Sequence, residues 1–218
     1  MIEAALLPLL LQLGEAPEAY YEPQFSDETT GIVQSADDLE PDAFILALDR
    51  LADEGDDSAL EVLGEIFSFG LFGFERDAGR ACDYFERVGE RRADSLHNQA
   101  TCYFSGDGRP QDHARARTLY VAAAEAGWIM SYCAYGNMLV RGEGGPVDAA
   151  EGVRLCRMTA ASGDADAQTD YGTYLLTGQG VERDPVTARF VLEQAEVFQF
   201  EQMLAHFFNA MERSGTRD

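Results

Sequence analysis

The chain has 218 residues, of which 46% are hydrophobic, so it is long enough to bury a core and is not a disordered polar chain. Its 39 acidic residues outnumber the 16 basic residues, all of them arginine, and the net charge is −23. The acidic excess argues against nucleic acid as a partner. The absence of lysine excludes a lysine Schiff base and a phosphate loop that ends in Gly-Lys-Ser/Thr.

The first 13 residues, from Met1 to Leu13, form a short apolar run. A secretory signal would begin with Lys or Arg, but Glu3 stands there instead. We therefore predict a packed apolar segment in a cytoplasmic protein. Export to the periplasm is the alternative if residues 1–13 act as a signal. No apolar run approaches the roughly 20 residues that cross a bilayer, so we expect no membrane span.

Residues 14–41 mix proline, glycine, acidic and aromatic residues, a composition that predicts irregular chain draped on the domain that follows. Residues 1–56 hold 14 acidic residues and one arginine, so this quarter of the chain carries more than half of the charge excess. Such acidity is typical of a soluble surface, and it also fits an acidic docking surface for a basic partner. The sequence leaves both interpretations open.

From residue 42 to residue 198 the sequence repeats itself every 36 residues. Small residues keep this period at two positions, and self-similarity of this length is the signature of a repeat architecture. The two series are Gly70, Gly106, Gly142 and Gly178, and Gly64, Ala100, Gly136 and Gly172.

One unit, residues 164–198, shows what a repeat folds into. Its first half has helical periodicity, with Gly172 on a face of small residues that lets a second helix approach closely. A glycine-containing loop follows, after which Asp184 can cap a second helix and Pro185 suits its first turn. A hairpin of two helices cannot bury its apolar face alone, so neighbouring repeats must stack on it.

The same unit resembles the Sel-one-like repeat family, relatives of the tetratricopeptide repeat. The resemblance implies an all-α fold, a right-handed superhelical solenoid of stacked antiparallel helix pairs with a 36-residue period. It implies a partial repeat over 42–54 and full repeats over 57–92, 93–127, 128–163 and 164–198. The matching residues are Ala167, Tyr171, Gly172, Leu175, Gly178, Gly180, Val181, Asp184 and Ala188.

These boundaries give three regions: residues 1–41, the solenoid over 42–198, and a C-terminal capping helix and tail over 199–218. The apolar residues of 196–211 suit a helix that seals the last repeat. The first repeat departs from the family pattern, because its loop is one residue longer and lacks Gly-x-Gly. Phe69, Phe72 and Phe74 crowd this loop, and we expect them to pack against the apolar N-terminal segment.

The sequence shows no metal or cofactor motif. Cys82, Cys102, Cys133 and Cys156 lack Cys-x-x-Cys spacing, and the three histidines are far apart. These cysteines also do not follow the arrangement of the cysteine-rich branch of the family. We therefore expect reduced, buried cysteines.

We also expect no catalytic residues. The sequence has neither a Gly-x-Ser-x-Gly elbow nor His-Glu-x-x-His, and Asp112 beside His113 is interpreted as a helix cap. The glycine-rich loops fall in repeat register and are interpreted as hairpin loops. Trp128, near a repeat boundary, is expected in the core between repeats.

The resemblance implies a non-catalytic adaptor or scaffold, often bacterial, that is a monomer or weak dimer. It would bind another protein or peptide, including a basic one, on its concave face. The alternative is an inhibitor or immunity protein that neutralises a toxic enzyme, because acidic inhibitors associate rapidly with basic enzymes. By analogy with tetratricopeptide repeats, the predicted concave-face residues are Glu61, Glu65, Phe69, His97, Thr101, Asn137, Arg141 and Thr173.

Overall fold

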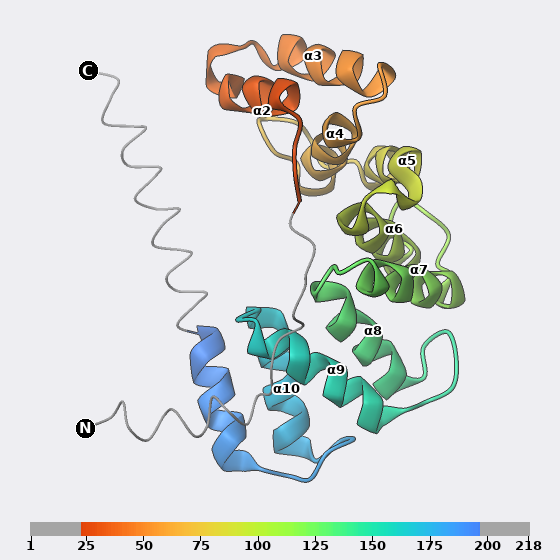
Figure 1. Cartoon of the computed structure of the whole chain (residues 1–218), viewed down its shortest axis with the longest axis vertical. Coiled ribbons are helices and arrows are strands. Elements are labelled where there is room, and N and C mark those ends of the chain that lie inside the picture. Colours follow the sequence, from red (N-terminus) through yellow and green to blue (C-terminus); the bar gives the residue numbers. More distant parts are fainter. Residues whose placement is uncertain (1–22, 197–218) are drawn as a thin grey trace, which may run out of the picture. The chain divides into compact units, whose positions relative to one another are not determined.

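A computed structural model of the chain describes residues 23–196, and within this range every regular element is a helix (Figure 1). The all-α class predicted from the sequence is confirmed. No helix in these residues is long and apolar enough to cross a membrane. The α-helices are α2 (Asp27–Gln34), α3 (Pro41–Asp53), α4 (Asp57–Phe69), α5 (Ala78–Val88), α6 (Ala93–Ser105), α7 (His113–Glu125), α8 (Met130–Arg141), α9 (Ala149–Ala161) and α10 (Ala165–Thr177). Residues 185–196 are also helical, and short 3-10 helices cover Ala36–Asp38 (η1) and Gly89–Arg91 (η2).

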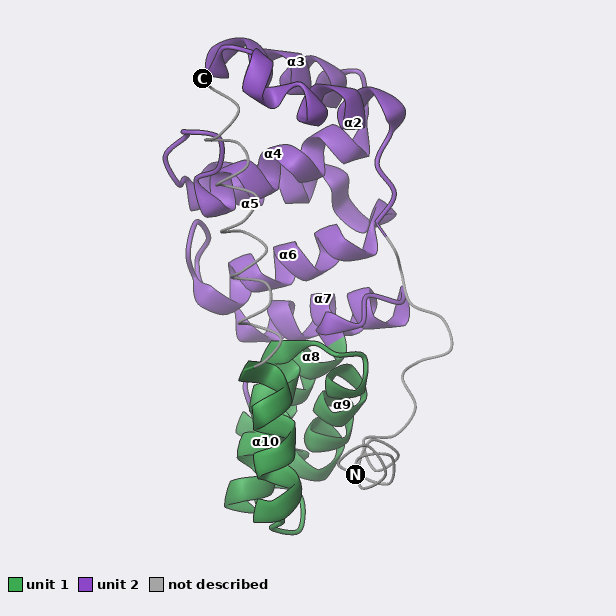
Figure 2. Ribbon diagram, turned by 90° about the vertical axis from the view of Figure 1, so that its left-hand side faces the viewer, with its two compact units in different colours: residues 1–18, 132–142, 146–218 green, residues 19–131, 143–145 purple. Residues whose placement is uncertain are grey.

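The chain divides into two compact units, which Figure 2 colours separately. Of the described residues, the N-terminal unit comprises 23–131 and 143–145, and the C-terminal unit comprises 132–142 and 146–196. The capping helix and tail predicted for 199–218, and the apolar segment or signal predicted for 1–13, lie outside the described residues.

The helices begin and end where the sequence places their caps. The side chains of Asp77, Asp112 and Asp148 accept hydrogen bonds from backbone N–H groups in the first turns of α5, α7 and α9, over 3.0, 3.0 and 3.1 Å. At the other end, α4 and α10 stop at Gly70 and Gly178, which adopt the left-handed conformation. The repeated Asp and Gly positions therefore act as start and stop signals for successive helices.

A second loop glycine in each of three repeats touches the backbone of the preceding repeat. A Cβ atom on Gly108 would lie 2.3 Å from the carbonyl oxygen of Ala78, and one on Gly180 would lie 2.3 Å from that of Ala149. Gly144 meets the carbonyl of His113 in the same way. All three have positive φ angles, so both their conformation and their surroundings require glycine. We call this backbone contact the glycine joint.

Within each hairpin, a small residue on the first helix lets the second helix approach. In the C-terminal unit, a Cβ on Gly136 would lie 2.5 Å from the carbonyl oxygen of Gly152, so α8 and α9 meet backbone to backbone. In the N-terminal unit, Gly64 makes room for the ring of Phe85. The close approach predicted for the 36-residue glycine series is confirmed at these positions.

The region predicted to be irregular, residues 14–41, contains a helix, so that prediction is wrong for residues 27–34. Ser26 caps α2 by accepting from the backbone N–H of Thr29 over 3.1 Å. The hydroxyl of the fully buried Thr29 then donates to the carboxylate of Asp56 over 3.0 Å, and the hydroxyl of Ser26 donates to the same carboxylate. These tertiary contacts stabilise a short helix whose composition alone does not indicate one.

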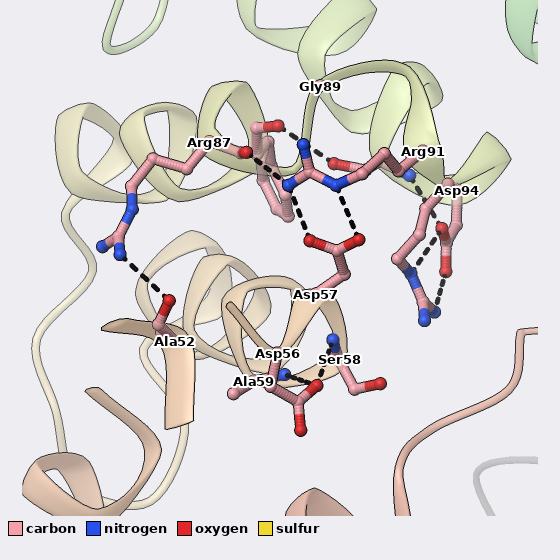
Figure 3. Close-up of polar contacts among 12 residues, drawn as sticks. Ala52, Asp56, Asp57, Ser58, Ala59, Arg87, Gly89, Arg91 and Asp94 are labelled. Carbon is pink, nitrogen blue, oxygen red and sulfur yellow. Dashed lines mark hydrogen bonds and ion pairs between the residues drawn. The ribbon is translucent and has the colours of Figure 1, made fainter. Parts of the chain in front are cut away.

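Asp56 also caps α4, as the close-up in Figure 3 shows, by accepting from the backbone N–H groups of Ser58 and Ala59. In the same view Arg91 pairs with Asp57 through two of its side-chain nitrogens, Nε and Nη2, at 2.7 and 2.6 Å. The pair ties the 3-10 turn that precedes α6 to the start of α4. Equivalent helices of successive repeats are thus linked by side chains at their N-terminal ends.

The prediction of reduced cysteines is wrong. Cys82 on α5 is bonded to Cys102 on α6, and Cys133 on α8 is bonded to Cys156 on α9. The first disulfide links two repeats and the second joins the two helices of one hairpin. The spacing of the four residues does not reveal this pairing, because the partners meet only when the helices are packed. Asp170 lies near the second disulfide, but both sulfur atoms are already bonded there.

The contacts of the three phenylalanines at the end of α4 and in the loop after it are described only in part. Phe72 packs against Phe44 of α3 at a ring distance of 5.0 Å, and Phe74 packs against Phe67 at 5.9 Å. Phe69 remains 72% exposed. The predicted partner, the N-terminal apolar segment, lies outside the described residues.

A candidate peptide-binding groove

A cavity of about 400 Å³ opens in the N-terminal unit between α4 and α6. Four of the eight predicted concave-face residues line it: Glu65 and Phe69 on α4, and His97 and Thr101 on α6. Residues four apart on a helix share one face, and the 36-residue period places Glu65 and Thr101 at equivalent positions. The repeat register thus brings these side chains to one surface, which we call the groove.

Glu61, one turn before Glu65, is fully buried and does not lie on the accessible face. One of its carboxylate oxygens accepts a hydrogen bond from the amide of Asn98 over 2.6 Å, and the other has no hydrogen-bond partner. Burial, with Asp94 and Glu65 nearby, raises the pKa of Glu61 to about 8, although Asn98 and Arg92 act in the opposite direction. Glu61 is therefore largely protonated at neutral pH, and it underlies the groove without facing solvent.

Glu65 is half-buried and lines the groove directly. Its carboxylate makes no hydrogen bond and no salt bridge with any residue that the structure describes. Burial raises its pKa and Asp94 raises it further, while Arg92 lowers it. The groove therefore contains a carboxylate whose charge is not compensated by a partner.

The arginines near this carboxylate already have acidic partners. Arg92 pairs with Asp94 through two nitrogens, at 3.1 and 2.6 Å, and both side chains are buried. Arg92 also donates to the backbone carbonyl of Gln24 over 2.7 Å. Arg76, which lines the groove, pairs with Asp107 on the far side.

His97 is neutral at physiological pH, because burial lowers the pKa of its imidazole to about 4. Its Nδ1 lies 2.8 Å from the hydroxyl oxygen of Ser131, and its ring packs edge-on against Tyr120 at 5.2 Å. The phenol of Tyr120 is also 2.9 Å from the hydroxyl of Thr101. These contacts hold His97 and Thr101 as a rigid, uncharged wall.

The other predicted site residues, Asn137, Arg141 and Thr173, belong to the C-terminal unit. Asn137 donates to the carboxylate of Asp170 over 2.6 Å and accepts from the hydroxyl of Tyr174, so its polar atoms are used within the unit. The exposed Thr173 donates to a backbone carbonyl of its own helix over 2.8 Å. Arg141 is exposed at the end of α8.

The groove lining also includes residues that the sequence analysis did not place on the concave face, among them Phe25, Asp94 and Trp128. Phe25 comes from the segment predicted to be irregular, and Asp94 occupies the first turn of α6. Trp128, expected in the core between repeats, lies half-buried in the lining, where its ring centre is 6.3 Å from that of His97. Only Trp128 offered a signal, because a single tryptophan next to a repeat boundary is a common recognition residue.

Comparison with known proteins agrees with this architecture. A model of the Sel1 repeat matches residues 58–90, 93–128, 129–164 and 165–195. A protective antigen present in uropathogenic Escherichia coli strains, which displays an SLR fold, is 25% identical with a TM-score of 0.65. That match covers 78% of this chain but 37% of the antigen, so the chain spans little more than a third of that protein's length.

A Sel1 repeat protein from Oxalobacter formigenes is 24% identical, also with a TM-score of 0.65, and the match covers 77% of this chain and 71% of that one. These similarities confirm the solenoid of helix pairs that the sequence predicts. The four matched repeats cover most of the chain, which belongs to the Sel1 repeat family.

Proposed function

We propose that this chain is a non-catalytic interaction protein whose N-terminal unit binds a segment of a partner protein in the groove. Sel1 repeat proteins are generally scaffolds for protein–protein interaction, and the family is generally non-catalytic. The observation that carries the proposal is the combination, in one concave surface, of an exposed aromatic side chain, Phe69, with the unpaired carboxylate of Glu65.

Such a surface has the composition of a recognition site. Binding sites are concave and largely apolar, with a few polar groups that fix the orientation of the ligand. Phe69 is 72% exposed, so it contributes little to the core and is available to a partner. The rigid wall of His97 and Thr101 keeps the opposite side of the groove in a fixed shape, which lowers the entropic cost of binding.

The test compares two equally exposed apolar residues of the same unit. Phe69→Asp alters the groove, whereas Leu46→Asp alters α3 at a side chain that is 70% exposed and lines no described cavity. Proteins captured from the native lysate by the unaltered chain should be lost with Phe69→Asp and retained with Leu46→Asp. Retention by both variants would rule out the groove as the site.

We also infer that the protein works in an oxidising compartment. All four cysteines of the chain are paired in disulfides, and cytosolic thiols are kept reduced. The pairing favours the exported alternative over the cytoplasmic one. Alkylation of the native protein with a mass-tagged maleimide directly after lysis should give no mass shift without reductant. Four reactive thiols would restore the cytoplasmic assignment.

The net charge of −23 also fits an inhibitor of a basic enzyme. The two functions differ in what happens to the partner on binding. If the captured protein is an enzyme whose activity falls in proportion to the amount of chain added, the inhibitor function applies. If its activity is unchanged while a third protein joins the complex, the chain is an adaptor.

A further inference from the structure

We propose that the segment bound by the N-terminal unit presents a bulky apolar side chain next to an arginine or lysine. The apolar side chain would enter a second cavity beside the groove, and the cationic one would pair with Glu65. This inference rests on the proposed function and specifies the chemistry of the partner.

The second cavity, of about 310 Å³, lies between α2 and α4, and we call it the apolar cavity. Its walls are mainly aliphatic and aromatic, from Val33, Val62, Ile66, Leu71 and Phe72. The last two residues belong to the loop that departs from the Gly-x-Gly pattern of the repeat. The apolar cavity therefore depends on the part of the first repeat that differs from the others.

The apolar cavity and the groove share two lining residues, Phe25 and Glu65. A peptide that crosses Glu65 can therefore place neighbouring side chains in the two spaces. One of these spaces is apolar, and the other is bordered by a carboxylate. Together, the two spaces favour a partner segment in which an apolar side chain stands next to a side chain that can pair with a carboxylate.

The acidic groups around Glu65 indicate that the partner side chain that enters the groove is basic. Glu61, Glu65 and Asp94 interact electrostatically with one another, and Arg92 is the one cation acting on both glutamates. Arg92 is held by Asp94 in a two-nitrogen pair, so it leaves Glu65 without a partner. A guanidinium or ammonium group supplies the missing donors and charge.

Aromatic residues near Glu65 suit the rest of such a side chain. Phe25, Phe69 and Trp128 all line the groove, and Phe25 already lies under the guanidinium of Arg92 at 5.1 Å. Arginine and lysine pack their aliphatic stems on apolar surfaces and place their charge over aromatic rings. A second cation can use the same groove in the same manner.

The chain's own N-terminal residues are a poorer match for this site. In the sequence, residues 1–22 directly precede Pro23, which is part of the groove lining, and they include an apolar run. They contain four glutamates and no arginine or lysine. A partner segment with a basic side chain therefore fits the charge of the site better than residues 1–22 do.

The experiment selects ligands from a random-peptide phage library on the immobilised full chain, with its disulfides intact, at pH 7.5. We expect enriched peptides to share an apolar residue next to Arg or Lys. The most enriched peptide is then synthesised with a fluorophore, together with an analogue in which Gln replaces its basic residue. Anisotropy titrations measure the affinity of both peptides for each variant.

Glu65→Gln should weaken binding of the basic peptide about tenfold and leave the Gln analogue unaffected, because only the basic peptide uses the charge. Glu182→Gln is the matched control: it removes the same charge from an exposed position of the C-terminal unit and should change neither affinity. Val33→Trp, which fills the apolar cavity, should weaken both peptides to the same extent. Circular dichroism melts check that each variant is folded.

The failures of the two proposals are distinguishable. If Thr101→Arg blocks the selected peptides but Glu65→Gln weakens the basic peptide and its analogue equally, the groove binds peptides without the chemistry inferred here, and only this inference is overturned. If no selected peptide responds to Thr101→Arg, the groove is not the binding site and both proposals fail. If peptides bind only after Leu9 and Leu10 are replaced by Asp, the chain's own N-terminal residues are the occupant, which also overturns this inference.

Discussion

The two units use the same helical hairpin but treat equivalent positions in opposite ways. In the N-terminal unit, Glu65 and Thr101 line an open groove, and the carboxylate of Glu65 has no partner among the described residues. At the same repeat position in the C-terminal unit, Asn137 is hydrogen-bonded to Asp170 and Tyr174. The repeat fixes where these side chains lie, while the residue at each position decides whether the surface is available to a partner.

The largest expected loss of stability comes from two glycine substitutions, one in each unit. They test whether both units are built on the same backbone contact. Gly108→Ala in the N-terminal unit and Gly180→Ala in the C-terminal unit should each lower the free energy of unfolding by about 4 kcal/mol. Each adds a Cβ that clashes with a backbone carbonyl, in addition to the strain of positive φ. Urea titration with circular dichroism measures the loss.

Gly163→Ala serves as the control, because Gly163 has a positive φ but nothing within 4 Å of an added Cβ. It should cost only about 1 kcal/mol. Equal losses for Gly163→Ala and Gly180→Ala would show that the glycine joint adds no packing constraint.

Removal of either disulfide should give the next largest loss of stability. Cys82→Ser with Cys102→Ser opens a loop with a sequence separation of 20, and the corresponding pair at Cys133 and Cys156 opens one of 23. In the chain-entropy model each removal costs about 3 kcal/mol. Although one disulfide links repeats and the other lies within a hairpin, denaturation should show nearly equal losses. A much larger loss for Cys82 and Cys102 would show that the bond between repeats also holds the groove in shape.

Glu61 should make the N-terminal unit sensitive to pH in a way that has no counterpart at Cys133, the equivalent position of the C-terminal unit. Its pKa is raised from 4.5 to about 8, so the folded protein keeps a proton that the unfolded chain releases. The stability due to this group is therefore complete below pH 4.5 and is lost as the pH rises towards 8. The slope is about 1.4 kcal/mol per pH unit, or about 2 kcal/mol between pH 6.5 and 8.

The groups that face Glu61 are Glu65, Asp94 and Arg92, and of these Glu65 also has a raised pKa and contributes in the same direction. Around pH 6.5 His97 acts in the opposite direction, because burial lowers its pKa from 6.5 to about 4 and the unfolded chain binds a proton that the folded protein does not. This opposing contribution fades as the pH rises towards 8. Unfolding followed by the fluorescence of Trp128, the single tryptophan, should lose most of this slope in Glu61→Gln. An unchanged slope would contradict the buried proton.

The smallest expected loss of stability comes from removing a helix cap, and it should be about the same in the two units. Asp112→Ala and Asp148→Ala each remove one hydrogen bond to the backbone of a second helix. Each should cost about 1 kcal/mol by urea denaturation, and asparagine at either position should restore most of it. A cost confined to one unit would mean that its second helix is held by other contacts.

The repeat could be predicted from the sequence because its signals are local. Gly106 and Gly178 end first helices, Asp112 and Asp148 begin second helices, and the 36-residue spacing places them in register. The helix α2 could not be predicted, because the contacts of Thr29 with Asp56 stabilise it across 27 residues of sequence. The disulfide pairing could not be predicted for the same reason.

The concave-face assignment of the site residues stays a prediction. Four of the predicted residues, Glu65, Phe69, His97 and Thr101, line one cavity. The repeat register could not show that Glu61 is fully buried, because its depth depends on how closely α4 and α6 pack. It also could not place Phe25, which reaches the groove through a segment outside the repeat pattern.

The glycine joint has a consequence for how such proteins change over evolutionary time. Successive repeats meet there through backbone atoms, as Gly108 and Gly180 meet the carbonyls of Ala78 and Ala149. A contact of this kind is indifferent to the side chains carried on the neighbouring first helix. Whole repeats can therefore be duplicated, deleted or exchanged between genes with the joint intact, and each exchange brings a new groove surface with it.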